Sequence, residues 1–100
     1  MREYRLSNQA EHDLDDILDY TAETWGDDQA EIYFESLIKC FINLSQHPML
    51  GRACNPMQLG LRRMEEGRHV IFYKPEKNGV FIGRILHQSS LPLRRHFIDS

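Results

Sequence analysis

The sequence predicts a single two-layered α+β domain, and three observations lead to that prediction. The chain has 100 residues, and 41% of them belong to the hydrophobic set, which is enough apolar material for one buried core. Apolar residues recur with a helical period in the first half of the chain and with a period of two in much of the second half. Short turn signals separate the later segments, as in antiparallel hairpins. The predicted order is strand, helix, helix and three strands, with the helical pair on one face of a mainly antiparallel sheet.

The first strand is expected at residues 4–6 and leads directly into a helix. Ser7 and Asn8 are both good N-cap residues, and Asn8 with Glu11 has the spacing of a capping box. The apolar positions that follow have helical spacing and predict a stripe buried on one side, made of Ala10, Leu14, Ile17, Leu18, Thr21 and Trp25.

A second helix should follow almost at once. Gly26 suits the end of the first helix, and the Asp27–Asp28 pair can cap the second. This helix should end near Gln46, because the residue before Pro48 is biased away from helical angles. Its wider apolar stripe predicts contacts with both the first helix and the sheet, through Ala30, Tyr33, Phe34, Leu37, Ile38, Phe41, Ile42 and Leu44.

The rest of the chain reads as a loop followed by three strands. Residues 47–60 contain two prolines and two glycines and predict an ordered loop. Strands are expected at residues 61–66, 69–74 and 80–87, with turns at Gly67-Arg68 and at residues 75–79. The last strand should be central, with an interruption at Gly83 and Arg84. The face of the sheet away from the helices is expected to be open and to carry most of the basic residues.

Charge is divided between the two halves of the chain. Residues 1–50 hold three basic and eleven acidic residues, a net charge of -8, whereas residues 51–100 hold nine basic and four acidic residues, a net charge of +5. Such asymmetry concerns partners more than fold. The overall charge of -3 argues against a general nucleic-acid binder, because neutralisation of phosphates supplies most of the affinity of such proteins.

Composition gives further expectations about compartment and cofactors. No apolar run approaches the length of a membrane span, and we expect one cytoplasmic domain over residues 1–100. Cys40 and Cys54 have no metal-ligand spacing and are expected to be reduced thiols, with a disulfide as the alternative. His12, Asp16 and Asp19 have a helical spacing that could bind a divalent cation, but no third element supplies ligands, and we interpret them as a solvated helix face. We expect no metal and no cofactor.

One group of residues could carry chemistry: Arg62, Arg63, Arg68, His69, Tyr73, Arg84 and His87. Strand alternation places His69 and Tyr73 on one face, and Arg84 and His87 on opposite faces. In a functional interpretation the arginines bind carboxylate or phosphate, and histidine and tyrosine transfer protons. In a structural interpretation these are half-buried strand residues, with Arg84 paired to an acid from a helix. The residues alone do not decide between the two.

Several short segments match a known family in order and spacing. They are Tyr4-Arg5-Leu6-Ser7, Asp13-Leu14-Asp15-Asp16-Ile17, Tyr20-Thr21 with Trp25-Gly26, His47-Pro48 with Gly51-Arg52, Gly60-Leu61-Arg62-Arg63, Gly67-Arg68-His69-Val70-Ile71-Phe72-Tyr73, and Arg84-Ile85-Leu86-His87-Gln88. With these segments the chain resembles the ParE toxins of bacterial type II toxin-antitoxin modules, within the wider RelE/ParE superfamily. The resemblance covers nearly the whole chain.

The resemblance implies a function and partners. It implies a RelE/ParE-like fold and a toxin that inhibits DNA gyrase, causes growth arrest and serves plasmid stabilisation. A ParD-like antitoxin would neutralise it in a heterotetramer or larger complex. The toxin would be an inhibitor and not an enzyme, with no sequence-specific nucleic-acid binding of its own. The alternatives are a RelE-like ribosome-dependent mRNA endoribonuclease and an inactive antitoxin-binding module.

Site residues are assigned on the charge of the second half together with the resemblance. The expected antitoxin-binding residues are Arg62, Arg63, Arg68, Tyr73 and Arg84. The expected target-binding residues, which would carry toxicity, are Arg84, His87, Arg94 and Arg95. No catalytic and no metal-binding residue is assigned. One departure concerns activity, since this chain has Ser90-Leu91 where many ParE relatives have Met-Asp.

Overall fold

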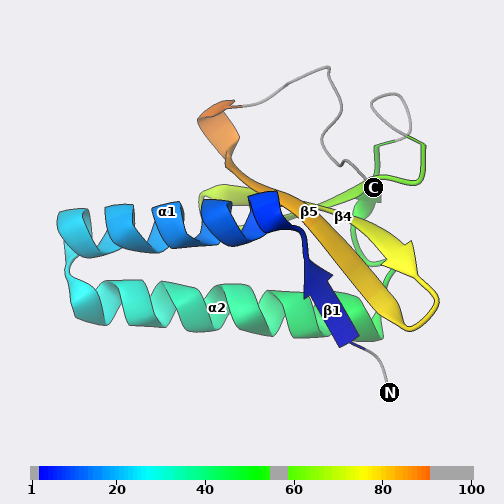
Figure 1. The fold of residues 1–100 in the computed structure, drawn as a ribbon, viewed down its shortest axis with the longest axis horizontal. Coiled ribbons are helices and arrows are strands. Elements are labelled where there is room, and N and C mark those ends of the chain that lie inside the picture. The colour runs from blue at the N-terminus through cyan, green and yellow to red at the C-terminus, as the bar shows by residue number, and fades with distance from the viewer. Residues whose placement is uncertain (1–2, 55–58, 91–100) are drawn as a thin grey trace.

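The structure, a computed structural model, describes residues 3–54 and 59–90. Figure 1 shows two antiparallel helices lying side by side next to a twisted sheet. This confirms the predicted α+β class and the order strand, helix, helix, strands. The elements are β1 (Glu3–Leu6), α1 (Asn8–Trp25), α2 (Asp27–Gln46), β2 (Arg52–Ala53), β3 (Arg62–Glu66), β4 (His69–Glu76), β5 (Gly79–His87) and a 3-10 turn, η1 (Gln88–Ser90).

The sheet has five strands in the order β1-β5-β4-β3-β2. Every neighbouring pair is antiparallel except β1 and β5, which run parallel. The expected central position of β5 is therefore confirmed. The two-residue strand β2 was not predicted, and it lies in the segment expected to be a loop.

A β-bulge interrupts β5 at the predicted place. Phe72 of β4 pairs with Arg84, while the next residue, Tyr73, pairs with Ile82, which leaves Gly83 as the extra residue. Because of the bulge, Ile82 and Ile85 both face the helices although they are three positions apart. Arg84 takes the opposite face.

Ser7, one of the two residues predicted to cap the first helix, is confirmed as its cap, whereas the start of the second helix differs from the prediction. Ser7 caps α1, since its hydroxyl oxygen accepts the Ala10 N–H at 2.9 Å, so the capping box expected at Asn8 is wrong. The Ser7 hydroxyl also donates to the Gly83 carbonyl, which ties the helix start to β5 and fixes the choice of cap. Gly26, with a φ of 98°, ends α1 and begins α2 without a side-chain cap. The Asp27–Asp28 pair thus lies in the first turn of α2, where negative charges stabilise the helix by interacting with the positive end of its dipole.

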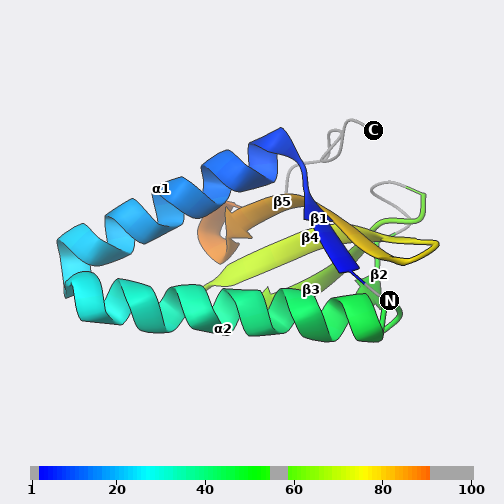
Figure 2. The ribbon, with the colours of Figure 1, turned by 60° about the horizontal axis from the view of Figure 1, so that its bottom comes forward.

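The main core lies between the helices and the sheet. It contains Ala10, Leu14, Ile17, Leu37, Cys40, Phe41, Leu44, Ile71, Tyr73, Val80, Ile82 and Ile85. In Figure 2 both helices lie along the sheet, which places their apolar stripes against it. Three residues of the predicted stripes, Trp25, Phe34 and Ile42, are nevertheless exposed. Trp25 occupies the last turn of α1, beyond the residues of this helix that are buried in the core.

A second apolar cluster lies on the face of the sheet away from the helices. It contains Cys54, Leu61, Val70, Phe72 and Leu86. The prediction of an open face is therefore partly wrong, because buried apolar side chains occupy the middle of this face. Both cysteines are free and buried, one in each cluster. Within residues 3–54 and 59–90, no helix has the length and apolar character needed to cross a bilayer.

Candidate functional site

Basic residues collect on the sheet face that carries the second apolar cluster. Residues that pair across neighbouring strands project to the same face. The register joins Arg52 to Arg63, Arg63 to Phe72, and Phe72 to Arg84, which makes one row across four strands. A parallel row joins Lys74, Phe81 and Arg5. We call these five cations, Arg5, Arg52, Arg63, Lys74 and Arg84, the far-face basic set.

Carboxylates partly neutralise the far-face basic set. Glu65 accepts hydrogen bonds from Arg52 at 2.7 Å and from Arg63 at 3.0 Å. Although burial raises the pKa of Glu65, these hydrogen bonds and the charges of the two arginines hold it below its usual value. The Nε of Arg63 is buried without a hydrogen-bond partner among the described residues.

Arg84 belongs to an ion pair with the first helix. Its Nε and Nη2 donate to the two carboxylate oxygens of Asp13 at 2.8 and 3.1 Å. Asp13 also accepts the Ile85 N–H at 2.9 Å, at the edge of β5 beyond the last residue that β1 pairs. Asp13 thus accepts a backbone N–H of β5 that β1 is too short to pair. The ion pair confirms one part of the structural interpretation, the pairing of Arg84 with a helix acid.

Tyr73 and Arg62 hold the loop that follows α2. Tyr73 is 0% exposed; its hydroxyl donates to the Pro48 carbonyl and accepts the Gly51 N–H, both at 2.8 Å. Arg62 donates to the carbonyls of Gly51 and Met49. Both residues project to the helix side, in agreement with the register. Tyr73 was expected to contact an antitoxin, but in the structure its side chain is fully enclosed by the chain itself.

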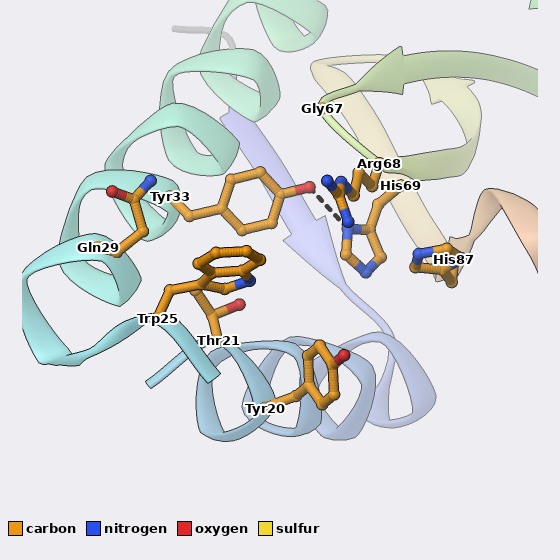
Figure 3. Close-up of a pocket in the computed structure, with 9 residues that line it drawn as sticks. All are labelled: Tyr20, Thr21, Trp25, Gln29, Tyr33, Gly67, Arg68, His69 and His87. Carbon is orange, nitrogen blue, oxygen red and sulfur yellow. Dashed lines mark hydrogen bonds between the residues drawn. The ribbon is translucent and has the colours of Figure 1, made fainter. Parts of the chain in front are cut away.

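Arg68 and His87 lie at a pocket near the point where α1 ends and α2 begins. The pocket has a volume of about 410 Å³, and Figure 3 shows how its residues face one another. Two aromatic rings from the end of α1 stand on one side and two histidines from the sheet on the other. The lining residues are Tyr20, Thr21, Trp25, Gln29, Tyr33, Gly67, Arg68, His69 and His87. We call this the aromatic pocket.

Hydrogen bonds fix the wall of the aromatic pocket. The Tyr33 hydroxyl lies 3.0 Å from the Glu66 carbonyl and 2.6 Å from Nδ1 of His69. Burial, together with the nearby charge of His87, lowers the pKa of His69 from 6.5 to about 4, so this imidazole is neutral at pH 7. Gly67 packs so closely on the Tyr33 ring that a Cβ there would lie 2.7 Å from the ring.

The 3-10 turn η1 fixes His87. The backbone N–H of Ser89 donates to Nδ1 of His87 at 3.1 Å, and the Ser89 hydroxyl lies 2.7 Å from the same nitrogen. The His69 and His87 rings meet edge to face with centroids 5.3 Å apart. His87 and His69 are paired in the register and face the helices. Arg84 faces the other side of the sheet, so the prediction that His87 and Arg84 lie on opposite faces is confirmed.

The structure thus divides the predicted site residues among three places. Arg63 and Arg84 share the far face, Arg62 and Tyr73 hold a loop on the helix side, and Arg68 and His87 lie at the aromatic pocket; Arg94 and Arg95 lie outside the described residues. Sequence reasoning missed the pocket residues Tyr20, Trp25 and Tyr33. Trp25 and Tyr33 have the spacing of core positions, and no local signal distinguishes them.

Comparison with known proteins defines the class. A family model described as the ParE toxin of the type II toxin-antitoxin system, parDE, matches residues 4–92. A solved structure described as the chromosomal ParDE TA system from P. aeruginosa has the same fold, with a TM-score of 0.72 and 20% identity; the match covers 87% of this chain and 96% of that chain. The chain belongs to the ParE toxin family.

Two curated relatives make the match more specific. Toxin ParE1 of Caulobacter vibrioides is 40% identical over 89 residues, which cover 89% of this chain and 92% of that protein. Toxin ParE1 of Mycobacterium tuberculosis (strain CDC 1551 / Oshkosh) is 37% identical over 86 residues, which cover 85% and 88% of the two chains. This chain is therefore similar to whole ParE1 toxins and not to a fragment of them.

Proposed function

We propose that this chain is the toxin of a type II toxin-antitoxin pair, that it inhibits DNA gyrase, and that a ParD-like antitoxin neutralises it. The observation that carries the proposal is the 40% identity to Toxin ParE1 of Caulobacter vibrioides, which extends over most of both chains. The toxin acts by binding and not by catalysis.

The first experiment measures DNA supercoiling and DNA cleavage by purified gyrase in the presence of this chain. We expect loss of supercoiling with accumulation of cleaved DNA, and relief of both effects by the antitoxin encoded beside it. Absence of any effect from folded, monodisperse protein would contradict the proposed target. A translation assay that shows messenger cleavage would then assign the chain to the ribonuclease alternative.

The antitoxin contact is proposed on two members of the far-face basic set, Arg63 and Arg84, together with Arg62 and Arg68. The family resemblance implies an antitoxin segment that folds on the toxin, and an acidic segment would complement these arginines. Arg63 and Arg84 lie in one cross-strand row, so an extended acidic segment can reach both. Arg62 and Arg68 lie elsewhere and would bind a different part of the partner. Tyr73 is left out because it is fully buried.

The contact is tested by substituting Arg63 and Arg84 together and, in a separate variant, Arg62 and Arg68 together. We expect the double variant Arg63→Gln, Arg84→Gln to weaken antitoxin binding at least tenfold in calorimetry. Arg5→Gln is a matched control, because Arg5 also pairs with a carboxylate, Glu76, but lies in the other row. Thermal melts must show that each variant is folded at the assay temperature. If replacing all four arginines with alanine leaves the affinity unchanged, the proposed contact is wrong.

The surface that binds gyrase is proposed around the end of β5 and the residues after it, including Arg84, His87, Arg94 and Arg95. His87 lies at the aromatic pocket, and its ring is held by η1. A truncation after Gln88 should fold and lose gyrase inhibition while it keeps antitoxin binding. A truncated protein that is folded and fully active against gyrase would rule out this surface.

A further inference from the structure

The aromatic pocket combines exposed rings with a volume that suits a small molecule. Tyr20 and Trp25 are 65% and 62% exposed, although such rings usually lie in cores or interfaces. The volume of about 410 Å³ falls within the range of ligand sites. A smaller hollow of about 280 Å³ shares Tyr20, His69 and His87 with it. The two rings offer flat surfaces on which a planar ligand can stack.

Arg68 supplies a positive charge at this pocket that forms no ion pair with a carboxylate of residues 3–54 or 59–90. Six arginines lie within residues 3–54 and 59–90, and Arg68 is the one whose guanidinium has no hydrogen bond or ion pair with another residue of those ranges. The others bind carboxylates or backbone carbonyls: Arg5, Arg52, Arg62, Arg63 and Arg84. A guanidinium that has no partner among the described residues and lies beside a pocket is suited to a phosphate, which it can bind through two N–H groups.

The two histidines offer a hydrogen-bond acceptor and a donor. In the tautomer that we assign, Tyr33 donates its proton to the Glu66 carbonyl and accepts the Nδ1–H of His69, which leaves Nε2 of His69 as an acceptor. Figure 3 shows this second nitrogen directed away from Tyr33 into the pocket. Nδ1 of His87 accepts the Ser89 N–H, so the neutral ring carries its proton on Nε2 and donates there. An adjacent donor and acceptor match the edge of an adenine base.

We propose that the aromatic pocket binds a nucleotide, with the base stacked against Trp25 and Tyr20 and the phosphate held by Arg68. His69 and His87 would hydrogen-bond the edge of the base. Stacking and one phosphate contact do not depend on the base, and only the hydrogen bonds to its edge favour adenine. A preference for one base is compatible with a chain that does not recognise a defined nucleic-acid sequence. The ligand chemistry is the same for a free nucleotide and for one nucleotide of a single strand. The inference goes beyond the proposed action on gyrase and does not depend on it.

The test uses the one tryptophan of the chain, Trp25, as a probe inside the site. Fluorescence is excited at the red edge of the tryptophan band and corrected with free N-acetyltryptophanamide, because nucleotides absorb nearby. Titration with AMP should give a saturable change, which calorimetry should reproduce. Adenosine should bind at least fivefold more weakly, and inorganic phosphate should leave the fluorescence unchanged.

Arg68→Gln is the decisive variant, because the exposed side chain can be replaced without disturbing a described contact. It should weaken AMP binding at least fivefold, to the level of adenosine. Arg52→Gln removes an arginine from the far face and should leave AMP binding unchanged. Equal AMP affinity in the wild type and in Arg68→Gln would overturn the proposal.

A second set of ligands distinguishes the source of the nucleotide. If a ten-nucleotide single strand of deoxyadenosine binds more than tenfold tighter than AMP, the pocket takes a base from a strand; equal affinity per nucleotide assigns it to the free nucleotide. If neither ligand binds while Arg68→Gln lowers antitoxin affinity, the pocket is a protein-docking site and the proposal is wrong. These assays contain no gyrase, so they fail or succeed separately from the proposed function.

Discussion

The hydroxyl of Tyr73 should make a large contribution to stability and none to partner binding. Tyr73→Phe removes the group that joins Pro48 and Gly51 across the core. Each hydrogen bond contributes about 1 kcal/mol net, and a buried N–H left without an acceptor costs about 1–3 kcal/mol. The free energy of unfolding should therefore fall by about 2–3 kcal/mol, which in a chain of this size lowers the melting temperature by about 10–20 °C.

Urea denaturation followed by far-ultraviolet circular dichroism measures this effect, since the tryptophan of the chain is largely exposed and reports poorly on the core. Tyr20→Phe is the matched control, because the Tyr20 side chain is exposed; it should change the free energy of unfolding by less than about 0.5 kcal/mol. Antitoxin affinity should be unchanged in Tyr73→Phe at a temperature where the variant is folded. A loss of stability below about 0.5 kcal/mol, or a loss of antitoxin binding by the folded variant, would refute the structural role.

Three further predictions follow from the same contacts. Asp13→Ala should cost about 2–4 kcal/mol of unfolding free energy in urea denaturation, because it leaves Arg84 and a buried backbone N–H without their acceptor. Gly67→Ala should cost about 2–3 kcal/mol, because it combines strain at a φ of 58° with a clash against the Tyr33 ring. The pKa of His69 is about 4 in the folded chain and 6.5 ordinarily, so the unfolded chain binds more protons than the folded chain between these pH values. The free energy of unfolding should therefore fall as the pH drops through this window and should not depend on His69 above it. The variant His69→Gln should reduce the slope of stability against pH.

Each of these predictions has a matched control. Asp15→Ala removes an exposed acid of the same helix and should change stability by less than about 0.5 kcal/mol. Gly60→Ala has a comparable positive φ of 81° with open space around it, so it should cost only about 1 kcal/mol; an equal cost at Gly67 would exclude the clash. His12→Gln removes an exposed histidine of α1 and should leave the pH slope intact. Identical slopes in the wild type and in His69→Gln would show that His69 does not carry the effect.

Local sequence signals were sufficient for most of the secondary structure. Helical spacing located both helices, and alternation between turn residues located β3, β4 and β5 to within one or two residues. The interruption expected at Gly83 is a β-bulge. These features depend on neighbours a few positions apart, which is why they can be read from the chain. The strand β2 was missed because its two residues pair only with β3 and have no period of their own.

The functional sites depend on contacts between distant residues. The sequence determined the fold class, the segregation of charge and, through resemblance, the family. Only the tertiary structure decided that Arg84 is bound to Asp13, that the Tyr73 hydroxyl is bonded to the loop after α2, and that an exposed Trp25 lines the same pocket as Arg68. Sequence spacing records which residues share a face of one helix or strand, whereas exposure and charge compensation depend on what the rest of the chain places opposite them.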